Sequence, residues 1–147
     1  MNDVIDVAEY MLNYCENDLG EAITNLQLQK FLYYVQGIKL AIDEVPMFMN
    51  NIEAWRYGPV VPDAYYWFND NLSNPIENVE ISNDVLSKSD KSIIKNVAKQ
   101  LIRITPWELV EKTHSESPWI NNYIPNFNQI IPDEDIKEWF KKNVIRR

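Results

Sequence analysis

One segment, from Glu53 to Phe68, constrains the fold more than any other part of the chain. It reads EAWRYGPVVPDAYYWF and holds one of the three glycines and two of the eight prolines. Gly58 can adopt backbone angles that other residues resist, and Pro59 fixes its own φ and disfavours the right-handed helical region for Gly58. Pro62 suits the first position of a helix, where a missing N–H is no loss. The segment therefore predicts a short extended piece, a rigid corner and a helix that carries large rings.

The residues at this corner, Trp55, Arg56 and Tyr57, are open to two interpretations. A rigid corner that presents aromatic rings and a guanidinium group is typical of a binding surface rather than of a catalytic centre. Trp and Tyr are also highly buried on average, so the same rings equally suit the core of a small domain. The residues alone leave both interpretations open.

Size and composition are those of one globular domain. The chain has 147 residues and 46% hydrophobic residues, so we expect residues 1–147 to form a single domain with one core. No stretch approaches the length of a membrane span, and no basic region precedes an apolar run at the N-terminus. Cys15 is the single cysteine, which excludes an intrachain disulfide and a multi-cysteine metal site. We therefore expect a cytoplasmic protein without a membrane partner.

The net charge of −8 bears on the choice of partner. Most of the acidic excess lies in residues 1–45. Such a chain repels nucleic acid and attracts a basic partner, although solubility alone also accounts for the charge. A stripe of basic residues on the expected helix 83–104 is the exception: Lys88, Lys91, Lys95, Lys99 and Arg103. Because no aromatic residue interleaves with them, we interpret the stripe as a solvated face and expect no binding of nucleic acid by the chain alone.

The spacing of apolar residues predicts a mainly α fold, a single compact helical domain of about five to six helices. The expected helices cover residues 3–17, 24–45, 83–104 and 105–114, with further helices beginning at Pro62 and Asp133 and a short turn at Ser117. Thr24 and Gln27 form a capping box at the start of the second helix. Residues 52–57 and 76–81 are candidates for the two strands of a short β-ribbon.

Gly37 lies inside the expected helix 24–45, where glycine costs about 1 kcal/mol relative to alanine. We interpret it as a point at which a neighbouring backbone passes close to the helix.

Catalytic and metal sites have little support in the sequence. His114 is the only histidine, and it lies beside Ser115 with Glu111 and Glu116 nearby. A His, a Ser and a Glu this close can be drawn as a hydrolytic triad, but triads are assembled from separate parts of a fold. A histidine near a helix C-terminus also interacts with the last carbonyls, so we favour packing or partner contact over catalysis. One His, one Cys and scattered carboxylates supply neither a zinc ligand set nor an EF-hand, so no metal or cofactor is expected.

Three motifs, taken in order, resemble those of one family. LQLQKFLYYVQ at 26–36 is similar to a "KLQKLLYYAQ" helix, EAWRYGPVVP at 53–62 to an "EAWxYGPVVP" segment, and HSESPW at 114–119 to an "H-x-E-x-PW" element. All three are typical of the Panacea domain, a phage-associated family long of unknown function, and the likeness covers essentially the whole chain. The resemblance marks these as structural motif residues: Lys30, Tyr33, Gln36, Gly58, Pro59, Pro62 and Pro118.

The resemblance implies an antitoxin that neutralises a cognate protein toxin, encoded by an adjacent gene, by direct stoichiometric binding. Alternatives are an adaptor that delivers the toxin to a host protease and a phage anti-defence or host-takeover protein; a hydrolase that uses His114 is less favoured. No catalytic residue, cofactor or metal is expected. The residues expected to contact the toxin are Trp55, Arg56, Tyr57, Tyr66, His114 and Trp119.

Overall fold

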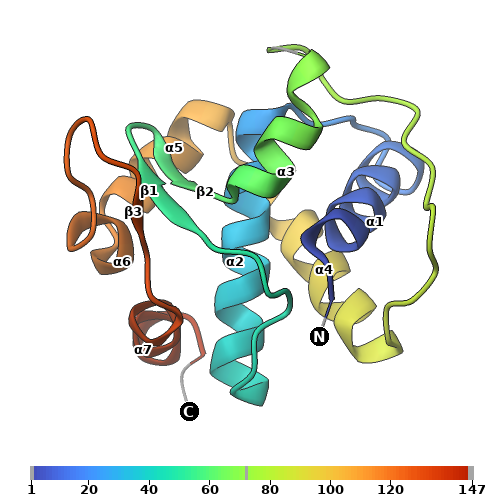
Figure 1. Cartoon of the computed structure of the whole chain (residues 1–147). Coiled ribbons are helices and arrows are strands. Elements are labelled where there is room, and N and C mark those ends of the chain that lie inside the picture. The colour runs from blue at the N-terminus through green and yellow to red at the C-terminus, as the bar shows by residue number, and fades with distance from the viewer. Residues whose placement is uncertain (1, 72, 146–147) are drawn as a thin grey trace.

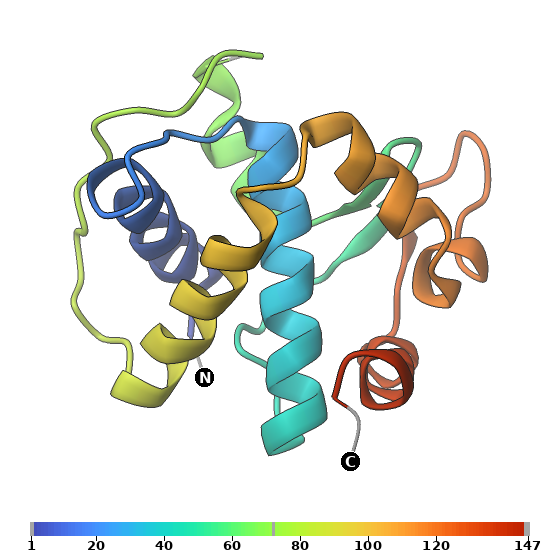
Figure 2. The same cartoon turned by 180° about the vertical axis from the view of Figure 1, so that it is seen from behind.

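A computed structural model describes residues 2–71 and 73–145, and one long helix organises it. This helix, α2 (Asn25–Asp43), runs through the middle of the molecule, with α1 (Val4–Asn17) and α4 (Lys88–Leu101) to one side and α5 (Pro106–His114) and α7 (Asp133–Asn143) to the other (Figures 1 and 2). Because neighbours cover it on all sides, α2 buries residues around its whole circumference. The mainly α fold predicted from the sequence is confirmed.

The helix starts follow from local side-chain chemistry. Thr24 and Gln27 form the predicted capping box at the start of α2, with the Thr24 N–H 2.9 Å from Gln27 Oε1. Asp3 caps α1 by accepting a hydrogen bond of 2.8 Å from the N–H of Ile5. The helix expected at 83–104 begins later, at Lys88, because Ser87 is extended and its hydroxyl accepts the N–H of Asp90.

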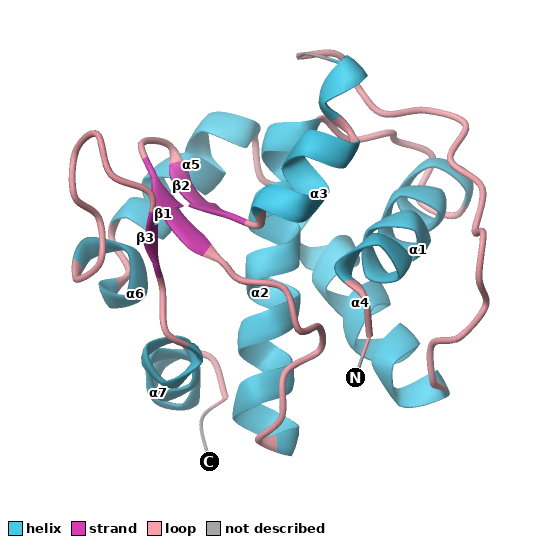
Figure 3. Cartoon of the chain, in the orientation of Figure 1, coloured by secondary structure: helices cyan, strands magenta, loops and turns pink. Residues whose placement is uncertain are grey.

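A small antiparallel sheet lies beside α2 (Figure 3). Its strands are β1 (Glu53–Trp55), β2 (Gly58–Val60) and β3 (Gln129–Ile130), in the order β2-β1-β3. Trp55 pairs with Gly58 at the end of the β1–β2 hairpin, which leaves Arg56 and Tyr57 as its two loop residues. Gly58 has a φ of +117°, so the conformation expected at the corner is present.

The prediction that residues 76–81 pair with residues 52–57 in a β-ribbon was wrong. Residues 76–81 form no strand and instead run along the outside of α1 as an extended loop (Figure 1). Two glutamates of α1 accept backbone N–H groups of this loop: the N–H of Asn78 lies 2.8 Å from Glu16 Oε1, and that of Ser82, just after the stretch, lies 3.0 Å from Glu9 Oε1. These side chains replace a neighbouring strand, and the second edge of β1 pairs with β3.

Four short or late elements complete the chain. They are α3 (Pro62–Trp67), the 3₁₀ helix η1 (Asn69–Asn71), α6 (Ser117–Ile120) and α7. Within the described residues there are thus seven α-helices, somewhat more than expected. The difference arises because the turn expected at Ser117 forms a single-turn helix, α6, with Pro118 near its start. No helix among them combines the length and apolar character needed to cross a membrane.

Gly37 is the point at which α7 packs against α2. A Cβ at this position would overlap the ring of Phe140, which is fully buried. The expectation of a close backbone was therefore wrong, and the neighbour is an aromatic side chain. Phe140 also makes edge contacts with Tyr33 and Tyr34, at ring-centroid distances of 5.4 Å each. Tyr33, a motif residue, thus helps to dock the last helix on the central one.

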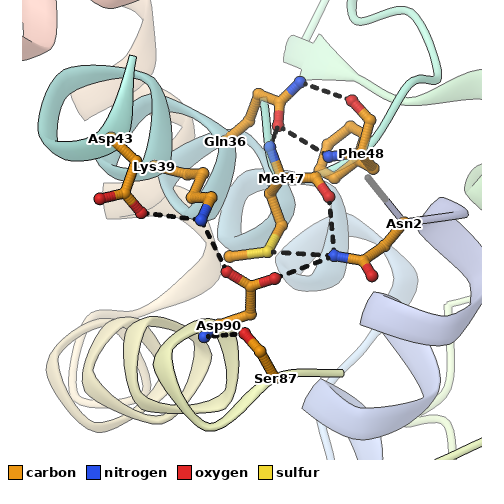
Figure 4. Close-up of polar contacts among 8 residues, drawn as sticks. All are labelled: Asn2, Gln36, Lys39, Asp43, Met47, Phe48, Ser87 and Asp90. Atoms are coloured by element: carbon orange, nitrogen blue, oxygen red, sulfur yellow. Dashed lines mark hydrogen bonds and ion pairs between the residues drawn. The ribbon is translucent and has the colours of Figure 1, made fainter. Parts of the chain in front are cut away.

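Gln36, another motif residue, holds the loop after α2 (Figure 4). Its Oε1 accepts hydrogen bonds from the N–H groups of Met47 at 2.7 Å and Phe48 at 3.2 Å, and its Nε2 donates to the carbonyl of Phe48. Beside it, Lys39 bridges α2 to α4 through Asp90 at 2.9 Å, and Asp90 also accepts a bond from Asn2. This network fixes the N-terminal residues and the 46–48 loop on the same end of α2.

Candidate functional site

The three residues of the β1–β2 hairpin end, Trp55, Arg56 and Tyr57, form a projecting corner. Arg56 is exposed and Tyr57 is 49% exposed, whereas the ring of Trp55 is half-buried. The Arg56 guanidinium carbon lies 5.4 Å from the centre of the Tyr57 ring. The interpretation as a binding surface therefore suits Arg56 and Tyr57, which face solvent. The interpretation as core packing suits Trp55, which packs on the scaffold.

Lys30 of α2 lies directly beneath the corner. Its side chain is fully buried, and its Nζ donates a hydrogen bond of 3.1 Å to the carbonyl of Pro59. A Cβ at Gly58 would lie 2.7 Å from Lys30 Cε and 2.7 Å from Thr113 Oγ1. Glycine is therefore required at this point both by backbone conformation and by space. Burial lowers the pKa of Lys30 from 10.5 to about 7.

Two amides of α2 hold the segment that follows the corner. Gln29 Oε1 accepts the N–H of Val61 at 2.9 Å, and Asn25 Nδ2 donates to the carbonyl of Tyr65 at 3.0 Å. A further bond of 2.9 Å joins Gln29 Nε2 to Asn25 Oδ1. These buried polar side chains fix β2 and α3 on α2, while Pro62 takes the first-turn position of α3 that was predicted.

His114 and Trp119 hold the corner from its other side. His114 Nε2 lies 3.0 Å from the carbonyl of Arg56, so the Nε2–H tautomer donates, and Trp119 Nε1 donates to the carbonyl of Trp55 at 2.7 Å. The two rings stack with centroids 4.0 Å apart. Burial, together with the charge of Lys30, lowers the pKa of His114. The hydrogen bond to the carbonyl of Arg56 favours protonation and opposes this shift, but burial outweighs it.

Glu116, between those two residues in sequence, faces the core. It is 2% exposed and accepts a hydrogen bond from the hydroxyl of Tyr34, with Lys112 Nζ 4.0 Å away. Burial raises the pKa of this carboxyl from 4.5 to about 7. Ser115 Oγ donates to the carbonyl of Lys112. Within the described residues, His114, Ser115 and Glu116 therefore hydrogen-bond to separate partners and form no relay.

A cleft of about 590 Å³ opens between the corner and the start of α2. Lys30, Trp55, Arg56, Tyr57, Val60 and Tyr65 are among the residues that line it. A second hollow, of about 440 Å³, lies on the other side of the corner and is lined in part by Trp55, Arg56 and Phe127. The corner thus projects between two depressions.

Two exposed aromatic rings, those of Trp107 and Tyr66, contact residues that line the first cleft. Tyr57 meets Trp107 of α5 at a centroid distance of 6.5 Å, and Trp107 is 60% exposed. The ring centroid of Tyr66 lies 6.1 Å from that of Trp55 and 5.3 Å from that of Tyr65, two residues that line the cleft, and Tyr66 is 63% exposed. Contiguous exposed aromatic surface is typical of a protein-binding site.

The predicted residues fall into three groups. Arg56, Tyr57 and Tyr66 face solvent, and Trp55, His114 and Trp119 are half-buried within the same cluster. The motif residues are buried except for the half-buried Pro62: Lys30, Tyr33, Gln36, Gly58, Pro59 and Pro118. Sequence reasoning missed Trp107 and Phe127 as exposed rings near the corner, because nothing in a linear pattern places α5 or the 124–130 loop there.

Nowhere in residues 2–71 and 73–145 do three His, Cys, Asp or Glu side chains gather closely enough to hold an ion.

Comparison with known proteins identifies relatives of this chain. A family model described as "Antitoxin SocA-like, Panacea domain" matches residues 28–120, which contain Lys30, the corner and Trp119. The chain is 34% identical over 109 residues to Antitoxin SocA of Caulobacter vibrioides (strain NA1000 / CB15N). That alignment covers 66% of this chain and 58% of the relative, so the chain spans less than two thirds of the relative's length. No solved structure matches.

Proposed function

Because the chain belongs to the SocA-like Panacea domain family, we propose that it is an antitoxin that neutralises a cognate protein toxin by direct, stoichiometric binding. Residues 1–147 act as one domain in this proposal, and the toxin is encoded by an adjacent gene. The protein is a binder and not an enzyme: His114 contacts a backbone carbonyl and a tryptophan ring rather than a nucleophile.

The observation that carries the proposal is a corner that is exposed at its side chains and held at its backbone. Arg56 and Tyr57 are open to solvent, while His114 and Trp119 bind the two carbonyls of Arg56 and Trp55. A surface fixed in this way loses little conformational freedom when a partner binds. Trp, Tyr and Arg are also the residues that most often dominate the energy of an interface.

The residues of the site have two roles in this proposal. Arg56, Tyr57 and Tyr66 contact the toxin together with the open face of Trp55. His114 and Trp119 contribute by positioning the corner, since their polar atoms are engaged with it.

Co-expression with the adjacent gene tests the proposal. The wild-type chain should restore growth that the neighbouring gene product stops, and the two proteins should purify together in equal amounts. Arg56→Ala should change the free energy of unfolding by less than about 1 kcal/mol, since Arg56 is exposed, yet weaken both rescue and co-purification. The matched control is Arg103→Ala, at an exposed position beyond α4, which should behave like wild type.

Several outcomes would contradict this proposal. Full protection by a folded Arg56→Ala protein would place the binding face elsewhere. Rescue without a stable complex, and only in cells with an intact protease, would point to delivery of the toxin for degradation. A substrate hydrolysed by wild type but not by His114→Ala would show an enzyme.

A further inference from the structure

The cleft between the corner and α2 differs in charge from the rest of the chain. The net charge is −8, yet the two charged residues among those that line the cleft, Lys30 and Arg56, are both basic. In the part of the chain that the structure describes, no Asp or Glu lines it. The cleft is therefore a local basic site in an acidic protein.

Among the described residues, Lys30 has no carboxylate partner at this site. Its side chain is fully buried, and no acidic group of the described residues lies within 4.0 Å of its Nζ. Its hydrogen bond to the carbonyl of Pro59 uses one of the three donors of a protonated amine. A buried ammonium group is costly unless it is paired and hydrogen-bonded, and burial accordingly lowers the pKa of Lys30 to about 7, so that the amine is only partly protonated near neutral pH. A carboxylate that enters the cleft would supply what this group lacks.

The rim of the cleft indicates the kind of molecule that brings the carboxylate. Arg56 lies at the mouth and is exposed, and the rings of Tyr57 and Trp107 extend the apolar surface beyond the cleft itself. A small anion would leave these rings in water. A protein segment would cover them and fill an apolar cleft of about 590 Å³.

We propose that this cleft binds an apolar segment of the partner protein that carries one acidic side chain, whose carboxylate pairs with Lys30 in the wall and Arg56 at the mouth. The inference rests on the proposed antitoxin function, because the partner is then the toxin. Charge complementarity selects the segment, and the aromatic rim supplies the contact area.

Short peptides test the recognition without knowledge of the toxin. The probes are acetylated, amidated Leu-Glu-Phe and its Gln and Lys counterparts, titrated into the isotope-labelled full chain and followed by amide NMR shifts. We expect the Glu peptide to bind at least fivefold more tightly than the Gln peptide and the Lys peptide to bind most weakly, a difference of about 1 kcal/mol or more. The shifts should lie in residues 24–30 and 57–60.

Two variants and a control assign the preference to the cleft. Lys30→Met keeps the length and apolar packing of the side chain and should abolish the preference for Glu over Gln, while Arg56→Gln should reduce it at least twofold. Lys99→Met removes the same charge from an exposed position of α4 and should leave the preference unchanged. Because Arg56 is exposed, its variant decides the matter if Lys30→Met does not fold.

Equal binding of the Glu and Gln peptides, no shifts up to the solubility limit, or shifts elsewhere would overturn the inference. So would stronger binding of a free-acid Leu-Gln-Phe peptide than of the amidated Glu peptide, since a chain end would then be the ligand. If the chain rescues growth but binds the Glu and Gln peptides equally, this inference is wrong and the proposed antitoxin function is unaffected. If the chain prefers the Glu peptide but does not rescue growth, the proposed antitoxin function is wrong and the peptide preference of the cleft still holds.

Discussion

Trp119 Nε1 donates a hydrogen bond of 2.7 Å to the carbonyl of Trp55, which joins residues 64 positions apart in the chain. The bond connects two of the three sequence motifs, and Lys30, whose Nζ binds the carbonyl of Pro59, connects the third. The motifs therefore meet at one place, beneath and beside the exposed corner. Their common task is to fix the backbone that presents Arg56 and Tyr57.

Replacement of Trp119 by Phe tests this connection. The variant keeps an aromatic ring next to His114 but removes the donor to the carbonyl of Trp55, so the free energy of unfolding should fall by about 1 kcal/mol. Trp119→Ala should cost more, because the stack with His114 and Tyr123 is lost as well. Urea denaturation measures both. A Phe variant as stable as wild type would show that the hydrogen bond contributes nothing to stability.

Gly58 and Gly20 form a matched pair for the role of glycine at the corner. Both have positive φ, +117° and +76°, but a Cβ at Gly20 would meet no atom within 4 Å, whereas one at Gly58 would press on Lys30 and Thr113. Gly20→Ala should thus cost about 1 kcal/mol from backbone strain alone. Gly58→Ala should cost clearly more, since steric overlap is added. Equal losses of stability in the two variants would contradict the close packing of Lys30 under the corner.

Some of this arrangement could be predicted from sequence because the signals are local. The capping box of Thr24 and Gln27, the corner at Gly58 and the start of α3 at Pro62 each depend on residues a few positions apart. The mainly α class followed from apolar spacing over whole helices.

The rest depends on contacts that no local pattern encodes. β3 has two residues, both exposed, and shows no alternation that would mark it as the partner of β1. Residues 76–81 do alternate, but Glu16 of α1 accepts the N–H of Asn78 within them and Glu9 accepts the N–H of Ser82 directly after them, so α1 and not a strand holds this segment. Nor does any spacing indicate that Lys30 would lie under Gly58, or Phe140 against Gly37. The exposed corner was predictable, whereas its supports and its cleft were not.

The buried carboxyl of Glu116 predicts a dependence of stability on pH. Burial raises its pKa from 4.5 to about 7, so between these values the folded state binds more protons than the unfolded state. The stability that Glu116 contributes is therefore present below about pH 4.5 and is lost as pH rises through about 7. Glu116→Gln should be more stable than wild type at pH 8, and the difference should shrink as pH falls toward 5.

Glu111→Gln provides the control for this series, since Glu111 is an exposed residue of the same helix region. It removes one carboxylate of the same kind without disturbing a buried group. Comparison of each variant with wild type also cancels the contribution of His114, whose lowered pKa acts in the opposite direction. A pH-independent difference for Glu116→Gln would show that this carboxyl is not held protonated by burial.

The basic stripe on α4 leads to a last prediction, that the chain alone does not bind nucleic acid. Lys91 pairs with Asp84 at 2.7 Å and lies 5.5 Å from the centre of the Tyr10 ring, and Lys95 lies 5.8 Å from that of Tyr14. These cations are engaged within the protein, and the net charge of −8 opposes the approach of a phosphate backbone. Mobility-shift titration with duplex DNA and RNA at low salt should show no complex.

Asp84→Asn is the sensitive control, because it releases Lys91 and lowers the acidity of the chain. Tight binding by wild type that weakens steeply with salt, and strengthens in Asp84→Asn, would identify the stripe as a nucleic-acid site.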